Sequence, residues 1–218
     1  FAGFAVGFAI LALWATVAMR GEWRAAVLPM ESDFGTVLRD AQARLERAAR
    51  DRRSPMHTPV IATGDADARV MVLRAFDPWT LRFHTDARAP KVGVIEADPR
   101  VGALFYDKAE KVQIRVQGQA RIERDSALAQ AAWEAGNNFA RRCYLGDGPG
   151  TVAQTASSGL PPQFEGPEPS DEDLIPAREH FAVLLVELTR LDWFHLAHDG
   201  HCRAQFDLAQ GTARWVTP

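Results

Sequence analysis

Short apolar runs, each bounded by turn-forming residues, fill the sequence between residues 59 and 124. Runs of this length and spacing are typical of β-strands. We expect strands at 59–63, 68–76, 80–85, 101–106 and 111–124, with a turn at 64–67 and a short helix within 89–99. Because these connections are too short for the crossover that a parallel pair requires, most neighbouring strands should be antiparallel. The pattern predicts a mainly β protein with flanking helices (α+β), folded as a small closed or partly closed barrel.

Further elements are predicted on both sides of this strand-rich region. Ser32 or Asp33 can cap a helix over 34–53, whose apolar residues recur at spacings of three and four. The pattern also predicts a helix at 126–145 and strands at 181–188, 192–197, 201–207 and 213–216. Residues 146–173 are rich in Gly, Pro, Ser and acidic residues, as long surface loops are. We therefore expect a single domain over 30–218 with a loop insertion at about 146–173.

The first 29 residues form an apolar extension that has two possible interpretations. Residues 1–19 contain no charge, and a helix of that length would be about 28 Å long, enough to cross a hydrocarbon core. The chain begins with Phe1, however, and no basic residue precedes the apolar run as in a signal peptide. Met30 offers a competing start. The extension is therefore either a membrane anchor or an over-extended reading frame.

Charge and cysteine content narrow the class of protein. The formal net charge of −3 gives no general attraction to nucleic acid or to anionic membranes. Cys143 and Cys202 lie far apart without CxxC spacing, which favours free thiols in a reducing compartment and hence the cytoplasm. The six histidines lack the spacing of a metal site on one helix, so we expect no metal.

Basic side chains collect where the predicted strands begin or end. Arg69, Arg74, Arg88 and Lys91 lie within 23 residues of one another together with Thr85. Convergent arginines and a lysine in the first turn of a helix suit a phosphate group, and GxGxxG and GxxxxGK[ST] motifs are absent. We therefore expect a phosphate-cofactor site for FMN. The alternative is a set of solvated charges on an exposed sheet.

Five blocks resemble the FMN-binding core of the pyridoxamine 5′-phosphate oxidase superfamily. They are RVMVLR (69–74), FHTDARAPK (83–91), DPRVGALFY (98–106), VQIRVQGQA (112–120) and LDWFHLAHDGHCRAQF (191–206). The resemblance covers roughly residues 55–125 and 180–218 and keeps the order and spacing of the blocks. It implies a split β-barrel of the FMN-binding type. It also implies a homodimer that binds FMN between two protomers, in which the partner covers an otherwise exposed sheet edge.

The resemblance assigns roles to individual residues. It implies that Arg69 and Lys91 bind the FMN phosphate beside Thr85. The expected cofactor-binding residues are Arg69, Val70, Met71, Val72, Leu73, Arg74, His84, Thr85, Arg88, Lys91, Gln113, Trp193 and Arg203. Gln113 has both a donor and an acceptor and could read the edge of the flavin ring, although it could equally be a polar position on a half-exposed strand.

The substrate end of the expected pocket departs from the family pattern. Arg74 stands where the oxidases have a lysine, and Asp199 replaces an arginine near the retained His201. Arg74 and His201 are the catalytic candidates, and Arg141, Arg142 and Tyr144 could serve a substrate anion. We expect an FMN-dependent oxidoreductase with an altered substrate site acting on a small molecule. The alternative is a non-catalytic flavin- or haem-binding module that acts as a sensor or carrier.

Overall fold

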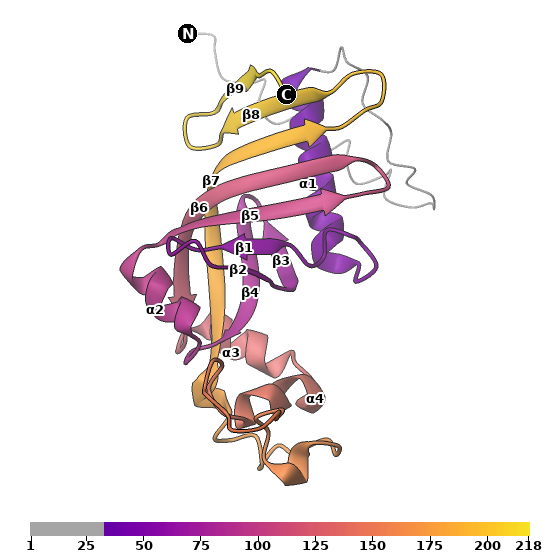
Figure 1. The fold of residues 1–218 in the computed structure, drawn as a ribbon. Helices are drawn as coiled ribbons and strands as arrows, with labels where there is room; N and C mark the ends of the chain where they lie inside the picture. Colours follow the sequence, from indigo (N-terminus) through magenta and orange to yellow (C-terminus); the bar gives the residue numbers. More distant parts are fainter. Residues whose placement is uncertain (1–32) are drawn as a thin grey trace, which may run out of the picture.

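The computed structural model describes residues 33–218, so the apolar extension at 1–29 lies outside the described part of the chain. One antiparallel sheet dominates the fold (Figure 1). Its strands are β1 (Val60–Ala62), β2 (Ala68–Val70), β3 (Leu73–Asp77), β4 (Thr80–Asp86), β5 (Arg100–Asp107), β6 (Val112–Glu123), β7 (Phe181–His195), β8 (Cys202–Asp207) and β9 (Thr212–Trp215). They are ordered β2-β1-β5-β6-β7-β4-β3, and β8 and β9 extend the sheet from β7. Between residues 33 and 218, no helix is long and apolar enough to cross a membrane.

Strand β7 joins the two halves of the sheet. It pairs with β6 on one edge, whereas on its other edge residues 181–187 pair with β4 and residues 190–195 pair with β8. The register with β6 shifts between Gln117 and Gly118, which leaves Thr189 as an extra residue in β7. A Cβ atom on Gly118 would lie 2.3 Å from the backbone oxygen of Glu187, so only glycine fits there. The sequence predicted two separate strands at 181–188 and 192–197. The structure instead has one continuous strand that contains this bulge.

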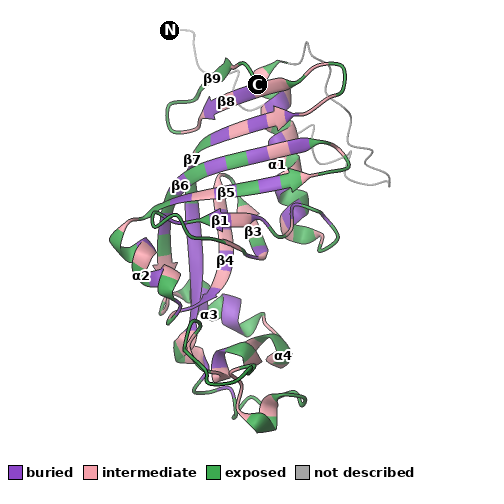
Figure 2. Cartoon of the chain, in the orientation of Figure 1, coloured by how far each residue is buried: buried purple, intermediate pink, exposed green. Residues whose placement is uncertain are grey.

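Helix α1 (Phe34–Arg50) closes the inner side of the sheet and lies behind it in Figure 1. Asp33 caps it as predicted, its side chain accepting a hydrogen bond from the Thr36 amide at 2.6 Å. Its buried residues are Val37, Ala41, Leu45 and Ala48, which belong to the main core together with the inward side chains of the strands (Figure 2). The result is a sheet curled into a half-barrel, which confirms the predicted fold class.

The hairpin region differs from the prediction at one point. The predicted strand at 68–76 is interrupted at Met71 and Val72, because β2 pairs with β1 at one end of the sheet and β3 pairs with β4 at the other. The register between β3 and β4 shifts between Leu73 and Ala75, which makes Arg74 the bulged residue. After β4, helix α2 (Pro90–Ala97) forms as predicted.

A second, smaller core lies below the barrel in Figure 1. We call residues 126–180 the lower lobe. It contains α3 (Ala127–Glu134), α4 (Asn138–Arg141), η1 (Arg142–Leu145), η2 (Pro162–Phe164) and η3 (Arg178–His180). Trp133 and Tyr144 of this lobe pack against Phe181 of β7. The prediction of one helix over 126–145 is wrong, because residues 135–137 end α3 and Asn137 caps a new helix by accepting from the Ala140 amide.

Candidate functional site

Two cations meet at the start of α2. Lys91 is half-buried, and burial lowers the pKa of its ammonium group, an effect to which the nearby charge of Arg69 adds. The N-cap residue Ala89 supplies no side-chain hydrogen bond to the helix. A half-buried lysine at an uncapped helix N-terminus, beside an arginine, is a favourable setting for an anion. Within residues 33–218, no carboxylate lies within ion-pair distance of Lys91.

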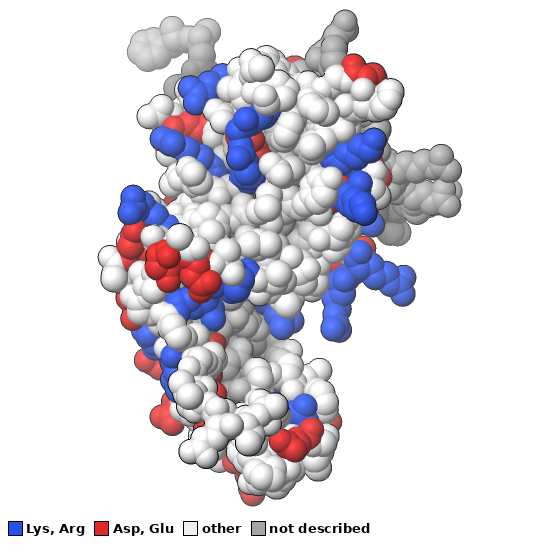
Figure 3. Space-filling model, in the orientation of Figure 1, with Lys and Arg blue, Asp and Glu red and all other residues white. Residues whose placement is uncertain are grey.

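Arg69 is held in place by its own hairpin. Its guanidinium forms an ion pair with Asp67 and donates to the Thr63 hydroxyl at 2.9 Å. These contacts orient Arg69 before any ligand binds, but the carboxylate of Asp67 offsets part of its charge. Figure 3 shows Asp and Glu gathered on the left of the view with Lys and Arg around them. Lys91 is therefore the stronger candidate of the two for binding a phosphate.

Thr85 and Arg88 have structural partners within the same segment. Thr85 is buried, and its hydroxyl donates a long hydrogen bond of 3.3 Å to the Asp86 carbonyl. Arg88 donates to the Asp86 carboxylate through Nε at 3.0 Å and through Nη2 at 2.7 Å. This hydrogen bonding raises the pKa of Arg88. Thr85 can replace its weak hydrogen bond by one to a ligand, whereas the guanidinium of Arg88 is held in its ion pair with Asp86.

The predicted flavin-lining segment alternates between the core and the surface. Met71 and Leu73 are buried in the main core, whereas Val70 is 63% exposed and Arg74 is exposed at the bulge. Val72 is half-buried. Of the five residues, only Val70, Val72 and Arg74 present side chains that a ligand could contact.

Of the predicted cofactor residues on β6, β7 and β8, Gln113 and Arg203 lie on the outer face of the upper half of the sheet, and Trp193 does not. Gln113 is opposite Phe194, and Arg203 is opposite Phe194 on the next strand. The guanidinium of Arg203 lies 6.0 Å from the Phe194 ring centroid, and the His201 ring is 5.7 Å from it. Trp193 faces the other way, is 2% exposed, and donates through Nε1 to Asp40 of α1 at 2.9 Å.

Within one chain, the structure does not bring the phosphate-binding candidate Arg69 together with Gln113 and Arg203. Arg69 is paired with Ile61, which is buried in the core, so Arg69 shares the inner face of the sheet. Gln113 and Arg203 occupy the outer face, because side chains alternate along each strand. A pocket that uses both sets requires residues from two protomers.

Asp192 is a polar residue of this outer face that the sequence did not single out. Its carboxylate accepts from Arg203 at 2.7 Å, from Arg115 at 2.8 Å and from Gln205 at 2.9 Å. Burial would raise its pKa, but these hydrogen bonds outweigh burial and lower it. Arg203 therefore reaches the outer face as part of a network. The pairing of β7 with β8, which a sequence does not show, creates that network.

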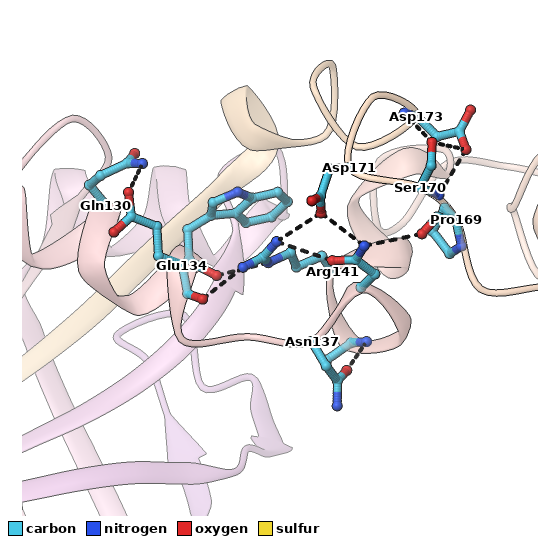
Figure 4. Close-up of polar contacts among 11 residues, drawn as sticks. Gln130, Glu134, Asn137, Arg141, Pro169, Ser170, Asp171 and Asp173 are labelled. Carbon is cyan, nitrogen blue, oxygen red and sulfur yellow. Dashed lines mark hydrogen bonds and ion pairs between the residues drawn. The ribbon is translucent and has the colours of Figure 1, made fainter.

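The two arginines suggested for a substrate anion hold the lower lobe together. Arg141 reaches from α4 toward the end of α3, where it donates to the carbonyls of Trp133 and Glu134 at 2.8 Å each (Figure 4). Arg142 donates to the Phe164 carbonyl at 2.9 Å. Both guanidinium groups are therefore used to order the lobe.

A basic cluster that the sequence only partly indicated lies on β3 and β4. His84 is half-buried, and burial, followed by the charges of Arg74 and Arg82, lowers its pKa from 6.5 to about 4. The sequence-based prediction did not include Arg82, although its spacing of two residues from His84 places both side chains on one face of the strand. Between residues 33 and 218, no group of three or more His, Cys, Asp or Glu side chains could hold a metal ion.

Comparisons with known proteins relate part of the chain to a known family. The sequence model described as pyridoxamine 5′-phosphate oxidase, FMN-binding domain, matches residues 36–124. The pyridoxine/pyridoxamine 5′-phosphate oxidase of Rubrobacter xylanophilus is 32% identical over 106 residues, covering 47% of this chain and 49% of that protein. The protein of the same name from Bordetella avium is 35% identical over 68 residues, covering 31% of each. The chain thus spans about half or less of the length of these curated relatives.

Solved structures share the fold. A pyridoxamine 5′-phosphate oxidase-related, FMN binding protein from Nostoc punctiforme aligns with a TM-score of 0.65 and 22% identity, over 83% of this chain and 97% of that one. PhzG from Burkholderia lata, solved with tetrahydrophenazine-1-carboxylic acid, aligns with a TM-score of 0.60 and 15% identity, over 84% and 91%. Both the predicted fold and the predicted family resemblance are confirmed. Residues 36–124 match the FMN-binding domain model of the pyridoxamine 5′-phosphate oxidase family, and the chain resembles that family over this part of its length.

Proposed function

We propose that this protein is an FMN-dependent oxidoreductase related to pyridoxamine 5′-phosphate oxidase, with an altered substrate site. The observation that carries the proposal is Lys91, a half-buried cation beside Arg69 at an uncapped helix N-terminus. A phosphate there would relieve the repulsion between the two cations and would accept the N–H groups of the helix. The residues therefore fit the phosphate end of FMN.

Each part of the chain has a separate task in this proposal. Lys91 and Arg69 bind the phosphate, and Thr85 can turn its hydroxyl from the Asp86 carbonyl toward it. Val70 and Val72 contact the flavin ring, and Arg74 lies where the ring meets a substrate. When bound, the flavin supplies the hydride chemistry, and these residues orient it and exclude water. We also propose that the protein works in the cytoplasm, where its two cysteines would stay reduced.

A homodimer is part of this proposal. Gln113 and Arg203 face away from Lys91 in one chain, so a second copy is needed to bring them to the same cofactor. The outer face of the sheet has a hollow of about 750 Å³ over β1, β5, β6, β7, β8 and β9, and its lining combines small and apolar residues with the charged side chains of Arg115, Arg190, Asp192, Asp207 and Arg214. It also exposes Leu104 and Tyr106. A hollowed face that combines exposed large apolar side chains with charged and polar groups is suited to a partner.

Sedimentation velocity tests the dimer. Leu104→Glu should shift the protein from dimer to monomer, because a carboxylate would be buried in the contact without a partner. Ile175→Glu is the matched control, since Ile175 is 72% exposed and lies in the lower lobe. A wild-type monomer at micromolar concentration would contradict the dimer.

Titration with FMN, followed through quenching of flavin fluorescence, tests the cofactor site. Lys91→Ala and Arg69→Ala should each weaken FMN binding by about tenfold or more, because each removes a charge-assisted hydrogen bond to the phosphate. Arg100→Ala is the control, because Arg100 is an exposed arginine paired with Asp98 at the start of β5. Equal affinity of the Lys91 variant and the control would refute the phosphate site.

A second candidate is a flavin- or haem-binding module without turnover. It is favoured by the structural use of Arg141 and Arg142, which leaves neither available for a substrate. The two functions differ in what happens to the reduced flavin. An oxidoreductase should pass electrons to an acceptor faster than free FMN does, whereas a carrier should not. Stopped-flow reoxidation at 450 nm, about the flavin absorption maximum, separates them.

A further inference from the structure

Three nitrogen-rich side chains converge on the outer face of β3 and β4. Arg82 and His84 are two residues apart on β4 and therefore point to the same side. Arg74 is the bulged residue of β3, and the register shift places it next to Arg82, because a bulge sets two residues opposite one. Burial and then the charges of both arginines lower the pKa of His84, in agreement with this placement.

The cluster contains no acid to balance it. Between residues 33 and 218, no carboxylate lies within 4.0 Å of a nitrogen of Arg74 or Arg82. Of the acids on this face, Asp86 is paired with Arg88 and Glu123 with Arg121, whereas Asp77 and Glu187 lie opposite Thr80, two residues along β4 from Arg82. Like charges held together without a counter-charge favour the binding of an anion.

Arg82 provides a second, independent indication. Its Nε is a buried side-chain atom without a hydrogen-bond partner in the described part of the chain, and buried polar atoms of this kind are rare. The residue as a whole is half-buried, so its guanidinium can turn and present the Nε and Nη donors to a ligand. These two donors form the fork that engages both oxygens of a planar oxyanion.

The surroundings favour a carboxylate over a phosphate. The floor beside His84 is apolar, with Phe181 5.0 Å from its ring centroid and the buried Val183 and Leu185 opposite His84 and Arg82. The cost of removing an ion from water rises with the square of its charge, so a phosphate dianion would cost about four times as much as a carboxylate. The backbone N–H groups of paired strands are also engaged in the sheet and cannot add donors.

We propose that Arg74, Arg82 and His84 form a receptor for the carboxylate of a small organic acid. The inference rests on the proposed function and names the class of its substrate. Arg82 is the specificity-determining residue, because its fork binds the two oxygens while Arg74 adds charge. Neutral His84 donates one N–H at neutral pH, and the Tyr144 ring closes the site from the lower lobe, where it packs against the same Phe181.

Binding of sodium benzoate to the full-length protein tests this receptor. Inorganic phosphate and chloride are compared with benzoate at equal ionic strength. The readout is the pKa of His84, followed through its ring Cε1–H resonance by NMR. Saturating benzoate should raise this pKa from about 4 by one unit or more, because a bound carboxylate stabilises the imidazolium. Arg82→Met should weaken benzoate binding at least tenfold, and Arg82→Lys, which keeps the charge without the fork, should recover only part of it.

Arg121→Met is the matched control, because Arg121 lies on the same face of the lower sheet but is exposed and paired with Glu123. Near-ultraviolet circular dichroism confirms that each variant is folded. An unchanged His84 pKa in benzoate would overturn the proposal, as would equal binding by Arg82→Met and wild type. Tighter binding of phosphate than of benzoate would overturn the carboxylate assignment. FMN affinity is measured separately, so loss of the cofactor function and loss of the receptor are distinguishable.

Discussion

Gly118 is the position at which a single methyl group should damage the fold most directly. The substitution Gly118→Ala would place a Cβ 2.3 Å from the Glu187 oxygen and 2.9 Å from the Glu187 carbon, both of which are backbone atoms. A normal contact requires the two strands to separate by about 1 Å at the bulge, which weakens neighbouring ladder hydrogen bonds and the packing beneath them. We expect a loss of about 1–3 kcal/mol in the free energy of unfolding, the range of overpacked core sites.

Urea denaturation followed by tryptophan fluorescence measures this loss. Gly102→Ala is the matched control, since Gly102 lies in the neighbouring strand β5 and its Cβ would meet only the Val116 oxygen, at 3.8 Å. That variant should change stability by less than about 0.5 kcal/mol, as ordinary surface substitutions do. Because Gly102 lies on the proposed dimer face, both variants are compared at two protein concentrations. Equal midpoints for the two variants, with unchanged slopes, would refute the steric argument.

Three further predictions concern polar groups. Asp40→Ala should lower the free energy of unfolding by about 1–3 kcal/mol, because it leaves the buried Trp193 N–H without an acceptor, and near-ultraviolet circular dichroism should report the loosened indole. As the pH falls from 6.5 to 4, the free energy of unfolding of the wild type should fall by about 2 kcal/mol, after allowance for partial exposure of the ring. The reason is that in this pH range His84 is protonated in the unfolded chain and neutral in the folded chain. His84→Phe should flatten this part of the curve of stability against pH. Asp192→Asn should cost about 1 kcal/mol in the free energy of unfolding at pH 7 and less at pH 3, because the stabilisation from the lowered pKa of Asp192 is complete above the unfolded pKa and is lost as the pH falls through the lower folded pKa; urea midpoints at the two pH values provide the check.

Local patterns predicted the elements that are held by local interactions. The cap at Asp33 and the apolar spacing of α1 depend on residues within one or two turns, and both are confirmed. The strands of the hairpins are likewise confirmed within two or three residues, with the break at Met71 as the exception. The clustering of Arg69 and Lys91 followed from their placement at the ends of short elements.

Long-range pairing explains what the sequence could not show. The continuity of β7 depends on the fit of Thr189 against Gly118, 71 positions apart in the chain. Whether an arginine makes structural hydrogen bonds or is available to a ligand depends on which carbonyl or carboxylate lies next to it in the fold. The sequence does not show this for Arg88, Arg141 or Arg142. Trp193 shows the same limit, because its inward orientation follows from its register in β7, opposite Ile114 of β6.

The pairing of β6 with β7 has a consequence for the rate of folding. These two strands are neighbours in the sheet, but residues 124–180 must first form a closed loop between them, and the lower lobe is contained in that loop. The entropic cost of closing a flexible loop grows only with the logarithm of its length, so halving it would lower the barrier by about 0.6 kcal/mol, or roughly threefold in rate. The chain can therefore carry an insertion of this size between its two longest strands with little penalty in speed. Variation in the length of this segment should affect what the lower lobe contacts far more than how fast the barrel forms.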